Sequence, residues 1–129
     1  MKLLLVFLLL IATTSFRSLD EKPIIPSNSI NTKINLVSFA GTWDTTFGRM
    51  KIYQNGYNVY GNYSWYDGSF EGYVNSEGVM IITWEQDGGF TCAKGKAVFE
   101  MNSSGNRFYG TWGCGGRSSG GGDWKGEKY

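Results

Sequence analysis

The side chains best suited to acid–base chemistry in this chain are carboxylates, because the sequence contains no histidine. Without histidine there is no Ser-His-Asp triad, no Cys-His pair and no His-ligated zinc. Glycoside cleavage would need two carboxylates about 5–10 Å apart across a cleft. No spacing separates such a pair from turn and outer-face residues among Asp44, Asp67, Glu71, Glu85 and Asp87. We therefore expect a non-enzymatic protein with no metal and no cofactor.

The two cysteines, Cys92 and Cys114, are the next candidates for chemistry. Two thiols are too few to hold a zinc ion alone, and in an oxidising compartment they would join as a disulfide. Two free thiols are the alternative. Asn62-Tyr63-Ser64 and Asn102-Ser103-Ser104 fit the acceptor pattern for N-glycosylation, which applies only if the host glycosylates.

The first residues predict export. Lys2 precedes an unbroken apolar run from Leu3 to Ala12, and small residues follow. Ten apolar residues span about 15 Å as a helix, half of a bilayer core of about 30 Å. The pattern predicts a signal peptide over residues 1–15, with cleavage after Ser15 or Ser18, and a protein secreted to the extracellular or periplasmic space.

Charge limits the partners. The chain carries twelve Lys and Arg against eleven Asp and Glu, and removal of Lys2 leaves a formally neutral protein. Such a surface lacks the long-range attraction that nucleic acids and anionic membranes exploit. We expect a small-molecule partner, no nucleic acid and no membrane, and the sequence leaves a homo-oligomer open.

The composition changes sharply near residue 38. All 19 glycines, five tryptophans and eight tyrosines lie at or beyond Gly41, whereas both prolines lie before it. We predict an extended arm or linker over residues 16–37 and a folded domain over 38–129. Turn signals such as Asn55-Gly56 and Asp87-Gly88 recur at spacings that suit a β meander. The expected strands are 39–46, 49–54, 57–65, 69–75, 79–86, 95–101, 106–113 and 123–129.

In a second pattern, a glycine follows one large side chain by two residues and precedes another large side chain by two residues. Alternation in a strand puts all three on one face of the sheet. Glycine weakens a strand by about 0.5–1 kcal/mol relative to alanine, so its repetition needs a geometric reason. A sheet coiled into a closed eight-stranded antiparallel up-and-down barrel supplies one, because its interior is narrow. The pattern occurs at Phe39-x-Gly41-x-Trp43, Val59-x-Gly61-x-Tyr63, Phe70-x-Gly72-x-Val74, Phe108-x-Gly110-x-Trp112 and Trp124-x-Gly126-x-Lys128.

These motifs resemble the calycins, and most closely the avidin and streptavidin group. The opening Gly41-Thr42-Trp43, Gly61-Asn62-Tyr63 in the third strand and the later tryptophans follow that family's order. The resemblance implies an all-β barrel whose open end holds a small ligand. The residues that it implies for the ligand site are Trp43, Thr45, Arg49, Tyr63, Trp84, Trp112 and Trp124.

Two details modify the resemblance. Lipocalins cover the opening tryptophan with a basic residue of the last strand, a position that Lys128 matches over Trp43. Avidins hold the polar head of biotin with small polar residues, and here Thr45, Arg49 and Trp65 stand at those positions. The polar contacts to biotin are therefore not retained. Trp124 contacts a neighbouring subunit if the avidin resemblance extends to assembly.

We accordingly expect a secreted binding protein for a small, partly aromatic or apolar ligand held against Trp and Tyr rings. Thr45 or Arg49 would supply the polar anchor. The same rings can instead fill the interior as a core, and a filled interior favours surface binding over a small-ligand site.

Two further functions stay open. Tyr60, Trp65 and Tyr66 form an aromatic segment near a hairpin end, as expected of a carbohydrate- or surface-binding module. The arm over residues 16–37 would suit a protease inhibitor that inserts an extended segment into an enzyme cleft.

Overall fold

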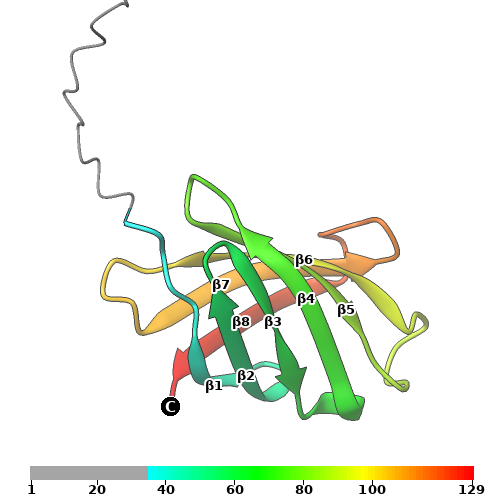
Figure 1. Ribbon diagram of the computed structural model, residues 1–129. Coiled ribbons are helices and arrows are strands. Elements are labelled where there is room, and N and C mark those ends of the chain that lie inside the picture. Colours follow the sequence, from blue (N-terminus) through cyan, green and yellow to red (C-terminus); the bar gives the residue numbers. More distant parts are fainter. Residues whose placement is uncertain (1–34) are drawn as a thin grey trace, which may run out of the picture. The chain divides into compact units, whose positions relative to one another are not determined.

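The computed structural model describes residues 35–129, and these form an eight-stranded antiparallel β-barrel. The predicted signal peptide and most of the predicted arm lie outside the described residues. Apart from the strands there is one short 3-10 turn, η1 (Trp65–Asp67). The strands, shown in Figure 1, are β1 (Gly41–Thr45), β2 (Gly48–Asn55), β3 (Asn58–Tyr63), β4 (Gly68–Val74), β5 (Val79–Glu85), β6 (Lys94–Met101), β7 (Arg107–Cys114) and β8 (Gly122–Lys128).

The barrel closes in simple sequence order. Each strand pairs with the next, and β8 returns to pair with β1, joining Trp43 with Lys128 and Thr45 with Gly126. Closure leaves no unpaired strand edge. This is the closed antiparallel up-and-down architecture predicted from the sequence, and each strand end lies within two residues of its predicted position.

The inward glycines allow the strands to coil tightly. A Cβ at Gly61, Gly72 or Gly110 would overlap a carbonyl oxygen of the neighbouring strand, respectively that of Lys51, Ile81 or Val98. At Gly126 a Cβ would instead overlap the ring of Phe108. The prediction that these glycines line the inside is therefore confirmed, and close approach of backbone or ring is the reason for them.

The inside of the barrel is packed with large side chains. Nine aromatic residues are among the sixteen buried hydrophobic residues, and tryptophan and phenylalanine rings meet edge to face along the axis. The buried residues are Phe39, Trp43, Met50, Ile52, Val59, Tyr63, Phe70, Val74, Met80, Ile82, Trp84, Ala97, Phe99, Phe108, Trp112 and Trp124.

One end of the barrel is closed by the segment that precedes β1. Leu36 and Val37 already pack on the core, slightly before the predicted domain start at residue 38, and Phe39 is fully buried. The indole N–H of Trp43 donates to the Phe39 carbonyl at 2.9 Å. Lys128 Nζ lies 5.5 Å from the centre of the Trp43 ring, which confirms the predicted cation–π contact.

The other end is closed by turns and by the disulfide. Cys92 in the β5–β6 loop is bonded to Cys114 at the end of β7, as predicted. The bond fixes the loop of residues 86–93 to the barrel wall. In residues 35–129 no helix has the length and apolar character needed to cross a membrane.

Candidate functional site

The five aromatic residues predicted to line a ligand site are all buried inside the barrel. Trp43, Tyr63, Trp84, Trp112 and Trp124 are between 0% and 7% exposed. Their rings pack on one another and on phenylalanines, with centroids 5.8 Å apart for Trp84 and Trp112 and 5.0 Å apart for Tyr63 and Trp124. The structure thus brings the predicted residues together, but as a packed core.

Most polar atoms of this core already have partners. Trp84 Nε1 donates to the Lys96 carbonyl at 3.2 Å, and the Tyr63 hydroxyl donates to Gln86 Oε1 at 2.8 Å. Within residues 35–129 no buried side-chain nitrogen or oxygen lacks a hydrogen bond. Burial raises the pKa of Tyr63, so this phenol stays neutral and remains a donor to Gln86. The indole N–H groups of Trp43, Trp84 and Trp124 and the Tyr63 hydroxyl are thus all used within the protein, whereas the indole N–H of Trp112 makes no hydrogen bond among the described residues.

The two residues predicted as polar anchors for a ligand, Thr45 and Arg49, are also bonded within the protein. The Thr45 hydroxyl donates to the Gly48 carbonyl at 2.7 Å and accepts from Trp124 Nε1 at 3.2 Å, so it stabilises the β1–β2 turn. Arg49 points away from the barrel, where its guanidinium lies 3.4 Å from Asp44 and stacks over the ring of Tyr129 at 3.8 Å. Thr45 lines a depression on the outer wall, described below, but its hydroxyl is already bonded within the protein.

The two asparagines of the glycosylation pattern differ in their surroundings. Asn62 is exposed on the outer face of β3. Asn102 shapes the β6–β7 turn, where its amide donates to Asn106 Oδ1 at 2.8 Å and its oxygen accepts from the backbone N–H of Arg107. A sugar on Asn102 would compete with these turn bonds, whereas Asn62 is free of them.

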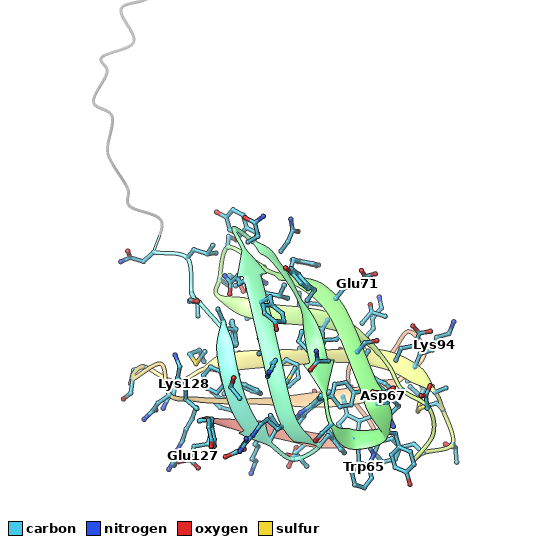
Figure 2. The ribbon with its side chains drawn as sticks, turned by 60° about the horizontal axis from the view of Figure 1, so that its bottom comes forward. Trp65, Asp67, Glu71, Lys94, Glu127 and Lys128 are labelled. Carbon is cyan, nitrogen blue, oxygen red and sulfur yellow. A yellow bond between two sulfur atoms is a disulfide. The ribbon has the colours of Figure 1, made fainter. Side chains whose placement is uncertain are left out.

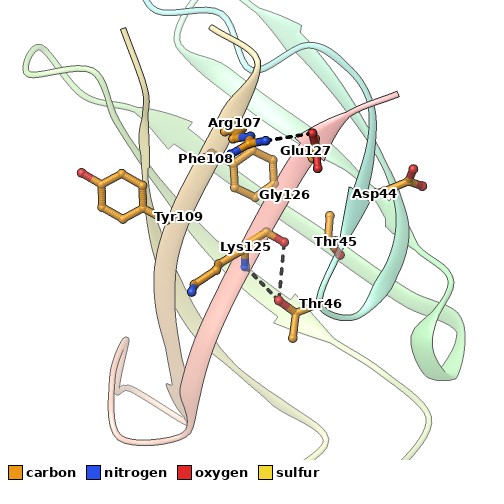
Figure 3. A pocket seen from close by; sticks show the side chains of 9 residues that line it. All are labelled: Asp44, Thr45, Thr46, Arg107, Phe108, Tyr109, Lys125, Gly126 and Glu127. Atoms are coloured by element: carbon orange, nitrogen blue, oxygen red, sulfur yellow. Dashed lines mark hydrogen bonds and ion pairs between the residues drawn. The ribbon is translucent and has the colours of Figure 1, made fainter. Parts of the chain in front are cut away.

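Two depressions on the outer wall of the barrel could hold a ligand. One runs over β1, β7 and β8 and is seen closely in Figure 3. Arg107 pairs with Glu127 at 3.2 Å, and the Thr46 hydroxyl accepts from the Lys125 backbone N–H at 3.0 Å. Among the described residues, the ammonium of Lys125 makes no hydrogen bond or ion pair, so it is the charged group that this depression leaves free for a ligand.

A second depression, which we call the wall groove, crosses the outer faces of β3, β4, β5 and β6. Strand register creates it: Tyr60 pairs with Glu71, Glu71 with Thr83, and Thr83 with Lys96. Tyr73 lies two residues after Glu71 on the same outer face of β4, and it pairs with Asn58 of β3. The side chains that line the groove are those of Asn58, Tyr60, Glu71, Tyr73, Ile81, Thr83 and Lys96.

The wall groove combines exposed rings with unpaired polar groups. Tyr60 and Tyr73 are 54% and 48% exposed, and Tyr60 stacks on Tyr53 with ring centres 5.4 Å apart and planes 22° apart. Figure 2 shows Glu71 on this wall, pointing away from the barrel. Among the described residues, no hydrogen bond or ion pair is made by the four polar side chains Asn58, Glu71, Thr83 and Lys96.

A third aromatic surface, the end cluster, lies at the barrel end that carries the disulfide. It consists of Phe47 in the β1–β2 turn, Trp65 and Tyr66 in η1, and Phe90 in the β5–β6 loop. Trp65, Tyr66 and Phe90 are exposed. Figure 2 shows Trp65 at this end, away from Glu71 on the wall.

One residue of the end cluster, Tyr66, has an uncommon backbone conformation. Tyr66 has φ of 45°, in the left-handed region that is uncommon for any residue other than glycine. The Tyr66 carbonyl accepts from the Asp87 N–H at 2.9 Å, which ties η1 to the β5–β6 loop. Residues held in such a conformation often belong to functional surfaces.

The sequence grouped the exposed rings differently from the structure. Tyr60 joins Tyr53 and Tyr73 on the wall, whereas Trp65 and Tyr66 join two phenylalanines at the end. Period-two alternation could have identified Tyr53 and Tyr73 as outward residues. Within the described residues, no three His, Cys, Asp or Glu side chains gather as a metal site would require.

No protein-family model, no curated protein and no solved structure matches this chain.

Proposed function

We propose that this protein is an exported, non-enzymatic β-barrel module that binds carbohydrate in the wall groove. The observation that carries the proposal is the combination of Tyr60 and Tyr73 with the unpaired Asn58, Glu71 and Lys96. The filled interior favours this surface over a ligand cavity inside the barrel.

The chemistry of the groove suits a sugar. A tyrosine ring offers a flat apolar face, and the C–H groups of a pyranose present a matching one. Sugar hydroxyls both donate and accept, so they can bond to the carboxylate of Glu71 and the ammonium of Lys96 at once. Glu71 and Lys96 lie two strands apart in one row, which amounts to about 9.6 Å at the usual strand spacing. This span fits a chain of two or more sugar units.

Three further features agree with a role outside the cell. The predicted signal peptide, the Cys92–Cys114 disulfide and the neutral charge of the mature chain all suit a secreted protein. The likeness of the tryptophan order to the avidin group supports a binding role. It does not extend to biotin, because Thr45 and Arg49 are already bonded.

Binding to polysaccharides tests the proposal. The purified protein would be incubated with insoluble cellulose and chitin and titrated with their soluble oligosaccharides by calorimetry. We expect retention on at least one of these, and at least a tenfold loss of affinity in Tyr60→Ala and in Tyr73→Ala, since truncating a central aromatic contact typically costs more than about 1 kcal/mol.

Tyr109→Ala is the matched control. Tyr109 is an equally exposed tyrosine on β7 that does not line the wall groove. Its loss should leave carbohydrate affinity unchanged. Equal losses in all three variants, or no binding of the wild-type protein to any carbohydrate offered, would argue against the wall groove.

A further inference from the structure

The ring of Phe90 packs against three other aromatic rings. Its centroid lies 4.4 Å from that of Trp112 and 6.4 Å from that of Trp65, and its plane is tilted from the two indoles by 31° and 33°. Phe47 meets it edge on, at 5.6 Å and 90°. Three aromatic residues from three different segments thus form a slot around one phenyl ring.

Phe90 nevertheless does not belong to the core. It is 36% exposed, whereas Trp112 beneath it is 7% exposed and forms the base of the slot. Trp112 is the most exposed of the sixteen buried hydrophobic residues. Phe90 therefore covers the part of the core that would otherwise face solvent at this end.

The loop that carries Phe90 is anchored before and after this residue, but Phe90 and its two neighbours make no hydrogen bond among the described residues. Backbone bonds hold the loop at Gln86, which donates to Ala93, and at Asp87, which donates to Tyr66. Among the described residues, none of the recorded hydrogen bonds involves residues 89–91. The disulfide at Cys92 anchors the loop two residues beyond Phe90. The ring can therefore leave the slot while both ends of the loop stay in place.

The slot already holds a flat aromatic group. The partners of Phe90 are one phenyl and two indole rings, and the phenyl ring packed among them shows that the slot accepts a planar ring.

We propose that Phe90 occupies a binding slot for a planar aromatic group, formed by Phe47, Trp65 and Trp112, and that such a ligand binds by displacing the Phe90 ring. The site lies outside the filled interior and apart from the wall groove. It is a second binding surface, independent of carbohydrate binding.

Indole is the probe for the test. Phe90→Ala empties the slot without replacing any buried residue. We expect this variant to bind indole at least tenfold more tightly than the wild-type protein in calorimetry. Adding Trp65→Ala to this variant should remove the gain, because one wall of the slot is lost. Tyr57→Ala is the control, because Tyr57 is an exposed tyrosine in the β2–β3 turn, outside the end cluster, and this variant should bind indole as the wild-type protein does.

Displacement is tested in the unmodified protein. Nuclear Overhauser contacts between the rings of Phe90 and Trp112 should be present without ligand and should disappear at saturating indole. Equal indole affinity of Phe90→Ala and wild type would overturn the proposal. So would an indole-bound wild-type protein that keeps the contact between Phe90 and Trp112.

Discussion

The aromatic residues inside the barrel and those on its wall have opposite surroundings. Inside, Trp43, Trp84 and Trp124 are buried, and each indole N–H donates to an oxygen of the protein. On the wall, Tyr60 and Tyr73 are about half exposed and stand beside polar side chains that bond to nothing else in the described chain. The same class of side chain therefore stabilises the fold in one place and is free for recognition in the other.

This contrast separates stability from binding. A small domain has a limited core, so each large buried ring contributes a substantial share of the few kcal/mol that keep it folded. An exposed ring contributes little to folding, and its retention on a sheet surface calls for another explanation. The following variants test whether the two groups of rings really differ in this way.

Trp43→Ala should have the largest effect on stability. Replacing a fully buried aromatic residue by alanine typically costs about 3–5 kcal/mol, and here it also removes the bond to Phe39 and the contact with Lys128. Urea denaturation followed by circular dichroism measures the change in the free energy of unfolding. A loss below about 1 kcal/mol would contradict the view that the interior rings are structural.

Gly110→Ala should come next, at about 1–3 kcal/mol, because the added methyl group overlaps the Val98 carbonyl and must push the strands apart. Gly116→Ala is the matched control, since a Cβ there meets no atom within 4 Å. The same denaturation experiment compares the two. If both substitutions had equal effects, the tight coiling of the strands would not be what requires glycine at position 110.

The buried phenol of Tyr63 should make stability depend on pH in the alkaline range. Its pKa in the folded state is raised above the ordinary value of about 10, so the unfolded chain loses this proton first. The stabilisation is fully present below pH 10 and is lost as pH rises, by about 1.4 kcal/mol per pH unit. Tyr63→Phe should lower this slope between pH 10 and pH 11.5, and an unchanged slope would refute the assignment.

Tyr60→Ala should have the smallest effect on folding, within about 0.5 kcal/mol of the wild-type free energy of unfolding. Its ring is about half exposed and stacks on the exposed ring of Tyr53. Together with Trp43→Ala it sharpens the comparison between wall and interior. A loss as large as that of an interior ring would mean that Tyr60 serves the fold.

The fold could be predicted from the sequence because glycine and large residues alternate with a fixed period. Gly61, Gly72 and Gly110 marked the inner face, and turn dipeptides marked the strand ends. The disulfide followed from the presence of only two cysteines. The contact between Lys128 and Trp43 followed from a family resemblance.

The candidate sites were harder to predict, because they depend on register and on loops. The wall groove exists because Asn58 pairs with Tyr73 and Tyr60 with Glu71, and no single-strand pattern gives that pairing. Phe47 and Phe90 lie in turns, where periodicity does not say which way a side chain points. Thr45 looked like a free hydroxyl, but it is used within its own turn.

Mapping of amide chemical shifts during a carbohydrate titration tests the central claim most directly. The account predicts that a bound oligosaccharide shifts the signals of residues on the outer faces of β3 to β6, around Tyr60, Glu71 and Lys96, and leaves the indole N–H signals of Trp43 and Trp84 unchanged. Shifts that concentrate on the interior indoles, with none on the wall, would contradict it.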